Sequence, residues 1–299
     1  MNDPNTILVV LNYNNYVDTS LFVNKINKYD EIKKIIIVDN CSQNNSFEIL
    51  LDEFSKNHKI DVIKSPINGG YAKGNNFGIK YSLLRYRFSN IIIANPDIII
   101  THENLLRLIN RKNELDKRKI KVGIVAPSMQ YTNGNVNYGW KRPRYIDDLR
   151  SSLMVMSKFM GDPLHKFKHR YVMKNTIFVD VVSGSFFLID KDAMIAIDFF
   201  DENTFLYCEE RILSFKLSLK KYSNFVLSDC FFYHKTSTSI KSALSETEMY
   251  KELNRSKEYY QERYLKVNLF QKLLFKFIAA IGLNERRLYF SIKQRRLNK

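Results

Sequence analysis

The chain has 299 residues, 45% of them hydrophobic, and its 47 lysine and arginine residues against 31 aspartate and glutamate residues leave a formal net charge of +16. This length supports a substantial core in one large domain with an elaborated end or in two modest domains. The charge favours an anionic partner, such as nucleic acid, an acidic membrane surface or a phosphorylated substrate. The three cysteines are too few and too scattered, without a CxxC pair, to suggest a disulfide framework or a zinc knuckle.

The N-terminal residues and the hydropathy of the chain bear on its location. The first residues lack the basic region and apolar core of a secretory signal. No charge-free apolar run approaches the ~18 residues expected of a membrane-spanning helix. We therefore expect a cytoplasmic protein in a reducing compartment, which can still attach to a membrane surface.

Short apolar runs alternate with helical segments in the first part of the chain. The runs are rich in β-branched residues and have no polar face, which is typical of buried parallel strands. The alternation predicts an open, doubly wound α/β sheet. The predicted strands are residues 7–11, 35–38, 61–64, 91–94 and 122–126, and the predicted helices are residues 17–26, 47–57, 73–84 and 104–116.

The pattern is lost in residues 129–176, where aromatic, basic and polar residues follow one another without a helix or strand period. This segment, which contains Trp140, is predicted to be an excursion over one face of the sheet. The core then resumes, with strands predicted at residues 179–182, 186–189 and 225–227 and a helix at residues 209–219.

The sequence after Ser245 is helical and strongly basic. Apolar residues fall on one helical face, and lysines lie off that face. A basic amphipathic helix of this kind favours a position in a membrane interface, and packing against the main domain is the alternative. The arginines and lysines near the C-terminus favour the membrane, because each can add about 1 kcal/mol near an anionic leaflet. The apolar face consists of Phe270, Leu273, Leu274, Phe277, Ile278 and Ile281.

Polar residues follow four of the predicted strands. Ligands of open parallel sheets bind beyond the carboxyl ends of the strands, so these residues are candidates for a site. Each group alone is also a common turn former, but together they indicate a binding edge. The groups are Asn12-Tyr13-Asn14, Asp39-Asn40-Cys41-Ser42, the glycine-rich segment 68–78 and Asn95-Pro96-Asp97.

The segment 68–78 places four glycines and three asparagines at the entrance to a predicted helix. Glycine lets the backbone approach a ligand, and the free amides of a helix start attract phosphate. A tight turn with a helix cap is the alternative. The chain lacks both a Gly-x-Gly-x-x-Gly turn after its first strand and a Walker loop, so a nucleotide would be held in another way.

In their order, the motifs resemble those of the family-2 glycosyltransferases of the GT-A fold, particularly the rhamnosyltransferase-like branch that builds bacterial surface polysaccharides. The resemblance covers roughly residues 6–240. Three further motifs complete the set of seven, namely Ser183-Gly184-Ser185-Phe186-Phe187, Phe205-Leu206-Tyr207-Cys208-Glu209-Glu210 and the late His234.

The resemblance implies a fold and a division of the chain. The fold would be α/β, with a mostly parallel central sheet flanked by helices. Residues 1–242 would form the GT-A domain, and residues 243–299 a helical, basic, amphipathic extension. Within the domain, residues 1–127 would bind the nucleotide and residues 128–242 the acceptor.

The resemblance also implies a donor site. Asp39 would hydrogen-bond the nucleotide base. Asp97 would be the last position of the family's Asp-x-Asp motif, of which Asn95 replaces the first position, and its carboxylate would hold Mg2+ or Mn2+ against the two phosphates. His234 would help to bind the metal or the diphosphate, although a packed core histidine is the alternative. The nucleoside and diphosphate would be bordered by Asn12, Gly70, Asn75 and Asn76.

An acidic pair, Glu209-Glu210, occupies the place of the family's Glu-Asp pair. Its second member would be the general base that deprotonates the acceptor hydroxyl, which assigns that role to Glu210. Two acids that simply favour a helix dipole are the alternative. One base without a second nucleophile fits a direct displacement with inverted configuration. The acceptor would lie near Trp140, Gly184 and Ser185.

These inferences predict a metal-dependent, inverting glycosyltransferase that uses a UDP- or dTDP-linked sugar. Its acceptor would be a glycan or an undecaprenyl-linked saccharide at the inner face of the cell membrane, without a nucleic-acid partner. A basic nucleic-acid-binding protein is one alternative, suggested by the charge of +16. A GT-A subunit without activity is another, because Asn95 and Glu210 depart from the strict motifs. Donor sugar, acceptor and oligomeric state are not readable from the sequence.

Overall fold

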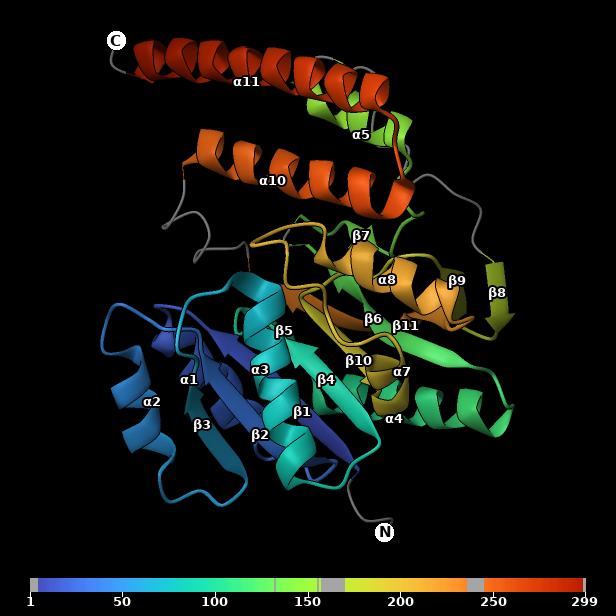
Figure 1. The fold of residues 1–299 in the computed structure, drawn as a ribbon. Coiled ribbons are helices and arrows are strands. Elements are labelled where there is room, and N and C mark those ends of the chain that lie inside the picture. Colours follow the sequence, from blue (N-terminus) through green and yellow to red (C-terminus); the bar gives the residue numbers. More distant parts are fainter. Residues whose placement is uncertain (1–4, 132, 155, 157–169, 236–244, 298–299) are drawn as a thin grey trace.

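The computed structural model describes residues 5–131, 133–154, 156, 170–235 and 245–297. These residues form one mixed β-sheet with helices on both faces and a separate layer of helices at one end (Figure 1). The order of the paired strands is β3-β2-β1-β4-β10-β6-β11-β9-β8, with β5 paired to β11 and β7 to β6.

The first half of the sheet is parallel, and each strand is connected to the next by a helix or a short turn. Its strands are apolar throughout because both of their faces are covered. The elements are β1 (Thr6–Asn12), α1 (Tyr16–Ile26), β2 (Ile32–Asp39), α2 (Ser46–Phe54), β3 (Ile60–Lys64), α3 (Gly70–Arg85) and β4 (Asn90–Ala94).

The second half continues the sheet through β10, which is antiparallel to both of its neighbours, and then through β6 and β11, which are parallel to each other. Its elements are β5 (Ile98–Ile100), α4 (His102–Lys117), β6 (Val122–Gln130), β7 (Val136–Asn137), α5 (Tyr145–Ser152), β8 (Arg170–Met173), β9 (Thr176–Val179), β10 (Phe186–Asp190), α7 (Lys191–Ala196), α8 (Glu209–Leu219) and β11 (Ser223–His234).

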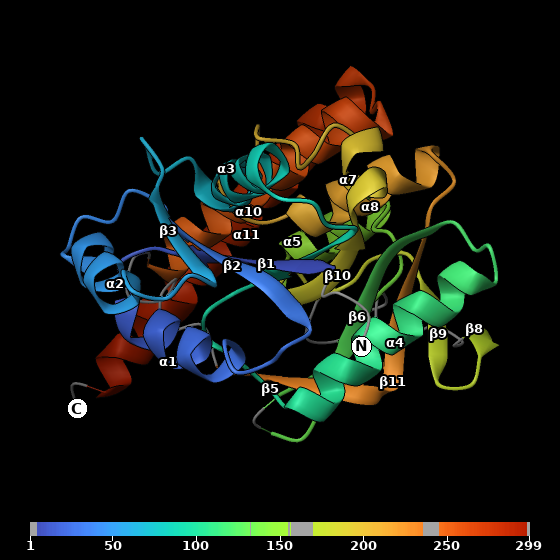
Figure 2. The same cartoon turned by 90° about the horizontal axis from the view of Figure 1, so that it is seen from below.

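Two hydrophobic cores lie on the two faces of the sheet. Figure 2 shows the helices on either side of the sheet. Helices α1, α2 and α4 cover one face, and helices α3, α7 and α8 cover the other. Strands β1, β2, β3, β4, β6 and β11 run in one direction, so their carboxyl ends meet at one edge. The predicted α/β fold with a mostly parallel central sheet is confirmed.

The glycine-rich segment is largely helical, because α3 already begins at Gly70 rather than at residue 73. A Cβ at Gly74 would lie 2.4 Å from Leu11, and one at Gly78 would lie 2.6 Å from Val38. Real Cβ atoms do not approach other atoms so closely, so these two glycines let α3 pack directly on β1 and β2. Gly74 and Gly78 thus serve helix–sheet packing, whereas Asn68, Gly70 and Tyr71 at the start of the segment line a cavity.

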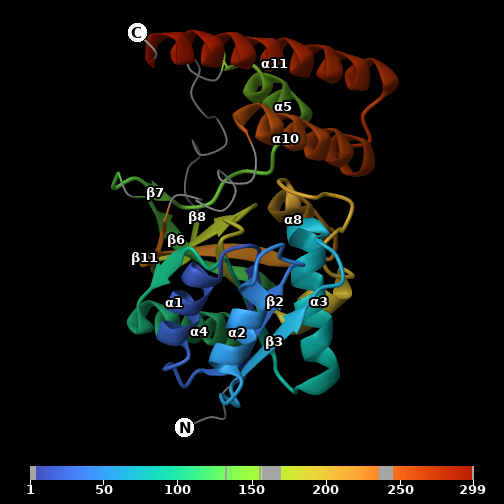
Figure 3. The same ribbon diagram turned by 90° about the vertical axis from the view of Figure 1, so that its left-hand side faces the viewer.

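The C-terminal helices α10 (Glu246–Tyr260) and α11 (Leu269–Leu297) are joined by the π-helical turn η1 (Gln261–Leu265). They form a layer with α5 beyond α8 (Figure 3). A Cβ at Gly282 would lie 2.1 Å from the backbone oxygen of Ser152, so a glycine is needed where α11 meets α5. Arg286 donates to the same oxygen and stacks on Tyr250 at 3.8 Å.

Helix α11 has two apolar faces. One packs on α5 and α10 and includes Phe275, which is 1% exposed. The other face is exposed and carries Phe270, Leu273, Phe277, Ile281, Leu288 and Ile292. Four of the six residues in the predicted apolar face belong to this exposed stripe. The other face packs against the rest of the protein, and a position of the helix in a membrane interface stays a prediction. In the described part of the chain, no helix is long and apolar enough to cross a membrane.

Two predicted boundaries differ from the structure or cannot be compared with it. The bounds predicted for the strand at residues 179–182 are wrong, because β9 ends at Val179 and Val181 forms only an isolated bridge to Trp140. The boundary predicted between residues 242 and 243 lies outside the described residues. The division into domains therefore stays a prediction.

Candidate active site

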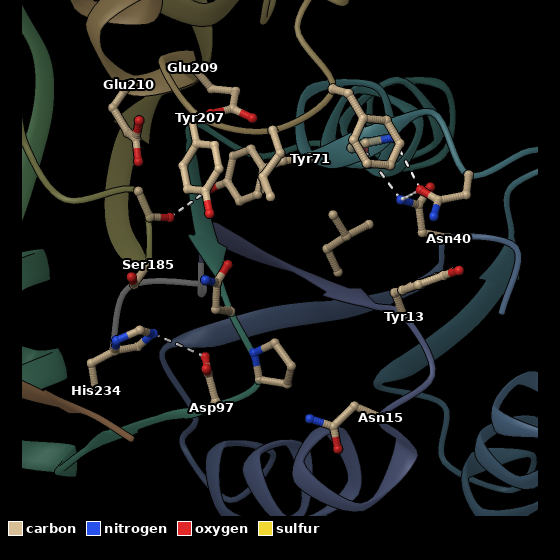
Figure 4. A pocket seen from close by; sticks show the side chains of 18 residues that line it. Tyr13, Asn15, Asn40, Tyr71, Asp97, Ser185, Tyr207, Glu209, Glu210 and His234 are labelled. Atoms are coloured by element: carbon tan, nitrogen blue, oxygen red, sulfur yellow. Dashed lines mark hydrogen bonds and ion pairs between the residues drawn. The ribbon is translucent and has the colours of Figure 1, made fainter. Parts of the chain in front are cut away.

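A cavity of ≈ 470 Å³ opens at the edge of the sheet where the carboxyl ends of β1, β2 and β4 meet (Figure 4). It is deep enough to hold a small ligand and is lined mainly by aromatic, amide and acidic side chains. Its lining residues are Leu11, Tyr13, Asn15, Asn40, Asn68, Gly70, Tyr71, Asn95, Pro96, Asp97, Gly184, Ser185, Phe205, Leu206, Tyr207, Glu209, Glu210 and His234.

Asp97 and His234 meet at one side of this cavity, with 3.3 Å between Asp97 Oδ1 and His234 Nε2. The pairing of β5 with β11 brings them together, since Ile98 lies opposite His234 and the backbone amide of Lys235 donates to the Asp97 carbonyl. Apart from this contact with each other, neither Asp97 Oδ1 nor His234 Nε2 has a hydrogen-bond partner among the described residues, although both atoms are buried. Buried polar atoms with so few partners are costly unless a ligand completes them.

The pair fits a divalent cation. A carboxylate oxygen and an imidazole nitrogen are ligands that Mn2+ accepts, and Mg2+ also takes carboxylate and phosphate oxygens. The described residues contain no cluster of three or more histidine, cysteine or acidic side chains that could hold a metal. Asp97 and His234 would thus supply only part of a coordination shell, and the oxygens of a bound substrate and water would supply the rest.

Glu209 and Glu210 face the cavity from the first turn of α8 (Figure 4). The two residues before the helix, Tyr207 and Cys208, both have left-handed backbone angles, with φ of 72° and 69°. Non-glycine residues in this region store strain, and they persist where the surrounding structure demands it. Here the strained turn ends the loop abruptly and directs both acids inward.

The two acids hold their protons more tightly than exposed carboxyl groups. Burial, followed by the negative charge of Glu210, raises the pKa of Glu209 to about 8. Burial also raises the pKa of Glu210. A carboxylate with a raised pKa is a stronger base near neutral pH than an ordinary glutamate.

Gly184 and Tyr71 complete the surroundings of this pair. A Cβ at Gly184 would lie 2.6 Å from Glu210 Oε1, so glycine leaves the room that the carboxylate occupies. Burial and the charges of the two acids raise the pKa of Tyr71 well above its usual value. Its phenol therefore stays protonated and donates to the Gly184 carbonyl at 2.6 Å.

Asp39 and Asn12 lie beside the cavity but do not line it. Both are fully buried. Asn12 Nδ2 donates to Asp39 Oδ2 at 2.8 Å, and the backbone amide of Ser42 donates to Asp39 Oδ1 at 2.9 Å. These bonds connect the ends of β1 and β2. A contact between Asp39 and a nucleotide base stays a prediction, and in this structure the carboxylate is committed to the protein.

The remaining predicted residues divide into two groups. Gly70 lines the cavity, as do Asn95 and Ser185. Asn76 instead bonds the backbone of Phe200, and Asn75 donates to the Tyr71 carbonyl within α3. Trp140 pairs with the backbone of Val181 and is not among the lining residues. The binding roles of all of them stay predictions.

Sequence reasoning gave no ligand-facing role to several lining residues, although they stood in its motifs. Tyr13, Asn40 and Phe205 belong to the identified motifs and line the cavity, but the sequence analysis gave the binding roles to other residues of these motifs. Alternation along a strand end could have separated them, because successive side chains point to opposite sides. Asn12 and Asp39 point into the protein, and Tyr13 and Asn40 point to the cavity.

Comparison with known proteins identifies the class. The model of the family Glycosyl transferase family 2 matches residues 7–196, more than half of the chain. The chain therefore belongs to glycosyltransferase family 2 and is a glycosyltransferase, as the motifs predicted.

Relatives and solved structures agree with this assignment. The chain is 25% identical over 217 residues to the rhamnosyltransferase WbbL of Escherichia coli (strain K12), which covers 71% of this chain and 76% of that protein. Its fold is similar to S. aureus TarS in complex with UDP-GlcNAc, with a TM-score of 0.56, 17% identity, and coverage of 94% of this chain and 72% of that one. It is also similar to the mannosyltransferase PcManGT from Pyrobaculum calidifontis in complex with GDP-Man and Mn2+, with a TM-score of 0.58, 12% identity, and coverage of 95% and 75%.

The raised pKa of Glu209 predicts a pH-dependent cost to stability. A carboxyl group whose pKa rises on folding stabilises the fold fully below its unfolded value, here 4.5, and this stability is lost as the pH rises through about 8. Each pKa unit corresponds to about 1.4 kcal/mol. Glu209→Gln should therefore raise the Tm relative to the wild type increasingly between pH 5 and pH 9, as measured by calorimetry.

The control for this measurement is Glu103→Gln, because the Glu103 side chain is 72% exposed. Its Tm difference from the wild type should stay constant over the same range. A Glu209→Gln difference that is equally constant would contradict the raised pKa.

Proposed function

We propose that this glycosyltransferase transfers a sugar from a nucleoside-diphosphate donor to a hydroxyl acceptor with inversion. The observation that carries this proposal is that the Asp97–His234 pair and Glu210 face the same cavity. The Asp97–His234 pair is suited to bind a metal-bound diphosphate, and Glu210 is suited to act as the base for the acceptor. The chemistry of one direct displacement needs both groups around one reacting carbon.

The donor class is supported by the chemistry of the site and by the similar proteins. The structure of TarS contains UDP-GlcNAc, and that of PcManGT contains GDP-Man and Mn2+. A divalent metal bound by Asp97 and His234 would neutralise charge on the departing diphosphate. Either Mn2+ or Mg2+ would serve, and UDP- and dTDP-sugars are the donors that we propose.

The transfer is a single exchange of bonds. The acceptor oxygen forms a bond to the anomeric carbon as the bond from this carbon to the diphosphate oxygen breaks. The bonding electrons leave with the nucleoside diphosphate, and the hydroxyl proton passes to the carboxylate of Glu210. The attack comes from the face opposite the leaving group, so the configuration inverts. Ser185 and Gly184 line the same part of the cavity as Glu210 and would contact the acceptor.

The exposed stripe of α11 supports a place on a membrane. Its apolar residues Phe270, Leu273 and Phe277 are 58% to 72% exposed, in a chain with a net charge of +16. An apolar helical face in a basic protein suits an anionic lipid surface. This position would bring the enzyme to a lipid-linked saccharide acceptor at the inner face of the cell membrane.

Nucleic-acid binding has less support. Several basic residues of the C-terminal layer make contacts within the protein and so do not contribute to a free basic groove. Lys272 and Lys276 pair with Glu262 and Glu258 at 2.5 and 2.9 Å, and Arg286 stacks on Tyr250. Glycosyltransferase family membership accounts for the site, so nucleic acid is not part of the proposal.

Removal of the Asp97 carboxylate should abolish the effect of Mn2+ on nucleotide binding. Among UDP, dTDP and GDP, at least one should raise the Tm more with Mn2+ than without it. A ligand at 100 times its Kd stabilises by about 2.7 kcal/mol. Asp97→Asn should lose the Mn2+-dependent part of this rise in a thermal-shift assay.

The matched control is Asp52→Asn, an exposed aspartate on α2. It should keep the full Mn2+-dependent rise. If Asp97→Asn also keeps it, the metal assignment is wrong.

Removal of the base should abolish turnover but leave donor binding. Glu210→Gln keeps the shape of the side chain and cannot accept the proton, so kcat should fall by about 10²–10⁴-fold. The Tm rise with the nucleotide and Mn2+ should stay unchanged. Product release is measured as nucleoside diphosphate, with the exposed Glu48→Gln as control. Normal turnover in Glu210→Gln would refute the assignment of the base.

Disruption of the α11 stripe should reduce membrane binding. The double variant Phe270→Ser/Phe277→Ser should co-sediment less than the wild type with vesicles that contain phosphatidylglycerol. Leu84→Ser is the control, because Leu84 is 84% exposed on α3, away from this layer. Equal co-sedimentation of the wild type and both variants would remove the membrane from the proposal.

A further inference from the structure

The C-terminal layer packs against the segment that forms the acidic wall of the cavity. Ser256 of α10 donates its hydroxyl to the carbonyl of Leu206 at 2.7 Å. Tyr259 donates to Asp201 Oδ2 at 2.7 Å, and Tyr264 of η1 donates to the same oxygen. Residues 201–210 are therefore bound from behind by α10 and η1, while their other side faces the cavity.

Arg211, the residue after Glu210, points away from the cavity into a buried polar cluster between α5, α8 and α10. Its Nη1 lies 2.8 Å from Asp148 Oδ1, and its guanidinium lies 5.3 Å from the ring centre of Tyr260. Gln261 donates to the other Asp148 oxygen at 3.1 Å. Asp148 and Gln261 are each 1% exposed.

A second cation lies in the same cluster. Lys257 of α10 is 3% exposed and donates to Ser151 of α5 at 2.9 Å. Burial lowers the pKa of Lys257, and the positive charge of Arg211 lowers it further, while Asp148 acts in the opposite direction. The cluster thus joins α5, α8 and α10 behind the acidic pair.

Stability alone does not explain this arrangement. Desolvation of a buried ion pair costs about as much as its attraction returns, and apolar replacements are often neutral or stabilising. The contacts of Asp148 do, however, have fixed directions, because Arg211 Nη1 donates to one carboxylate oxygen and Gln261 to the other. A contact of this kind defines orientation more than it adds stability.

We propose that Arg211 is a positioning residue for Glu210. Arg211 is itself held by residues of α5 and α10, so the C-terminal layer supports the catalytic site. The proposal rests on the proposed role of Glu210 as the base. Arg211 follows Glu210 in the first turn of α8, and the two residues before this helix, Tyr207 and Cys208, have strained backbone angles. The Arg211–Asp148 contact fixes this turn from behind and thereby sets the direction of the Glu210 carboxylate.

The charge of Arg211 also acts on its neighbour. Burial raises the pKa of Glu210, and the backbone amide of Glu210 and then the Arg211 charge lower it. The other ionisable groups that face Glu210 are Glu209 on the same helix and Tyr71 on α3. Beyond Arg211 lie Asp148, Lys257, Cys208 and Tyr260. Loss of the Arg211 charge should therefore raise the pKa of the base.

The test uses the double variant Arg211→Met/Asp148→Leu in the full-length chain. It removes both charges of the Arg211–Asp148 pair together, a change that buried ion pairs often tolerate, and Lys257 keeps its hydrogen bond to Ser151. Arg211→Lys keeps the charge but loses the planar contact. Lys112→Met is the matched control, because Lys112 is 1% exposed and pairs with Asp116 and Asp190 on the other side of the sheet from α8.

The assay follows Mn2+-dependent hydrolysis of the nucleotide sugar that the wild type cleaves fastest among UDP-glucose, UDP-N-acetylglucosamine, dTDP-rhamnose and GDP-mannose. The double variant should lose about tenfold or more in kcat, since small displacements of catalytic groups cost up to ~10²-fold. The acidic limb of its pH–rate profile should move to higher pH, because the positive charge that lowers the pKa of Glu210 is gone. Arg211→Lys should have a lower kcat, but the acidic limb of its pH–rate profile should stay at the pH of the wild type. Lys112→Met should change neither kcat nor the position of this limb.

Unchanged kcat and an unchanged acidic limb in the folded double variant would overturn the inference. Amide hydrogen exchange supplies a readout that needs no substrate. Residues 208–212 should exchange faster in the double variant than in the wild type, and residues 70–85 should not. If the wild type hydrolyses no donor, the proposed function fails, whereas equal exchange in residues 208–212 would by itself refute the positioning role.

Discussion

The site depends on the common direction of β1, β2, β4 and β11. Because these strands run the same way, their carboxyl ends meet at one edge, and residues distant in the sequence come together there. The antiparallel pairing of the short strand β5 with the end of β11 then sets Asp97 against His234. The polar Asp97–His234 pair at one side of the cavity follows from backbone pairing that the apolar strands stabilise.

The other wall of the cavity is held in a different way. Glu209 and Glu210 stand on a helix start that follows two strained residues, and their burial raises the pKa of both carboxyl groups. Such a position is costly, and contacts from behind α8 maintain it. The C-terminal helices provide these contacts on one face of α10, and α11 leaves a second, apolar face exposed. One layer thus supports the acidic wall and carries the exposed apolar stripe that we propose to bind a membrane.

The sequence predicted the sheet well, because strands buried on both faces leave continuous apolar runs such as residues 35–38. It also predicted α8 at residues 209–219 with the bounds that the structure has. It did not reveal that Gly74 and Gly78 are required by close helix–sheet packing, because no local pattern shows this, whereas Asn68 and Gly70 of the same segment do line the cavity. The Arg211–Asp148 pair was equally hidden, since two charged residues 63 positions apart read as surface residues until α5, α8 and α10 pack together.

The central claim is that one cavity holds a metal-bound diphosphate opposite a base. A crystal structure of the chain with Mn2+ and the nucleoside diphosphate that stabilises it most would test this claim directly. The account predicts an anomalous Mn2+ peak in contact with Asp97 and His234, with the diphosphate in the cavity that Glu210 lines. A Mn2+ ion and diphosphate bound elsewhere, or a cavity in which Glu210 faces away from the diphosphate, would contradict it.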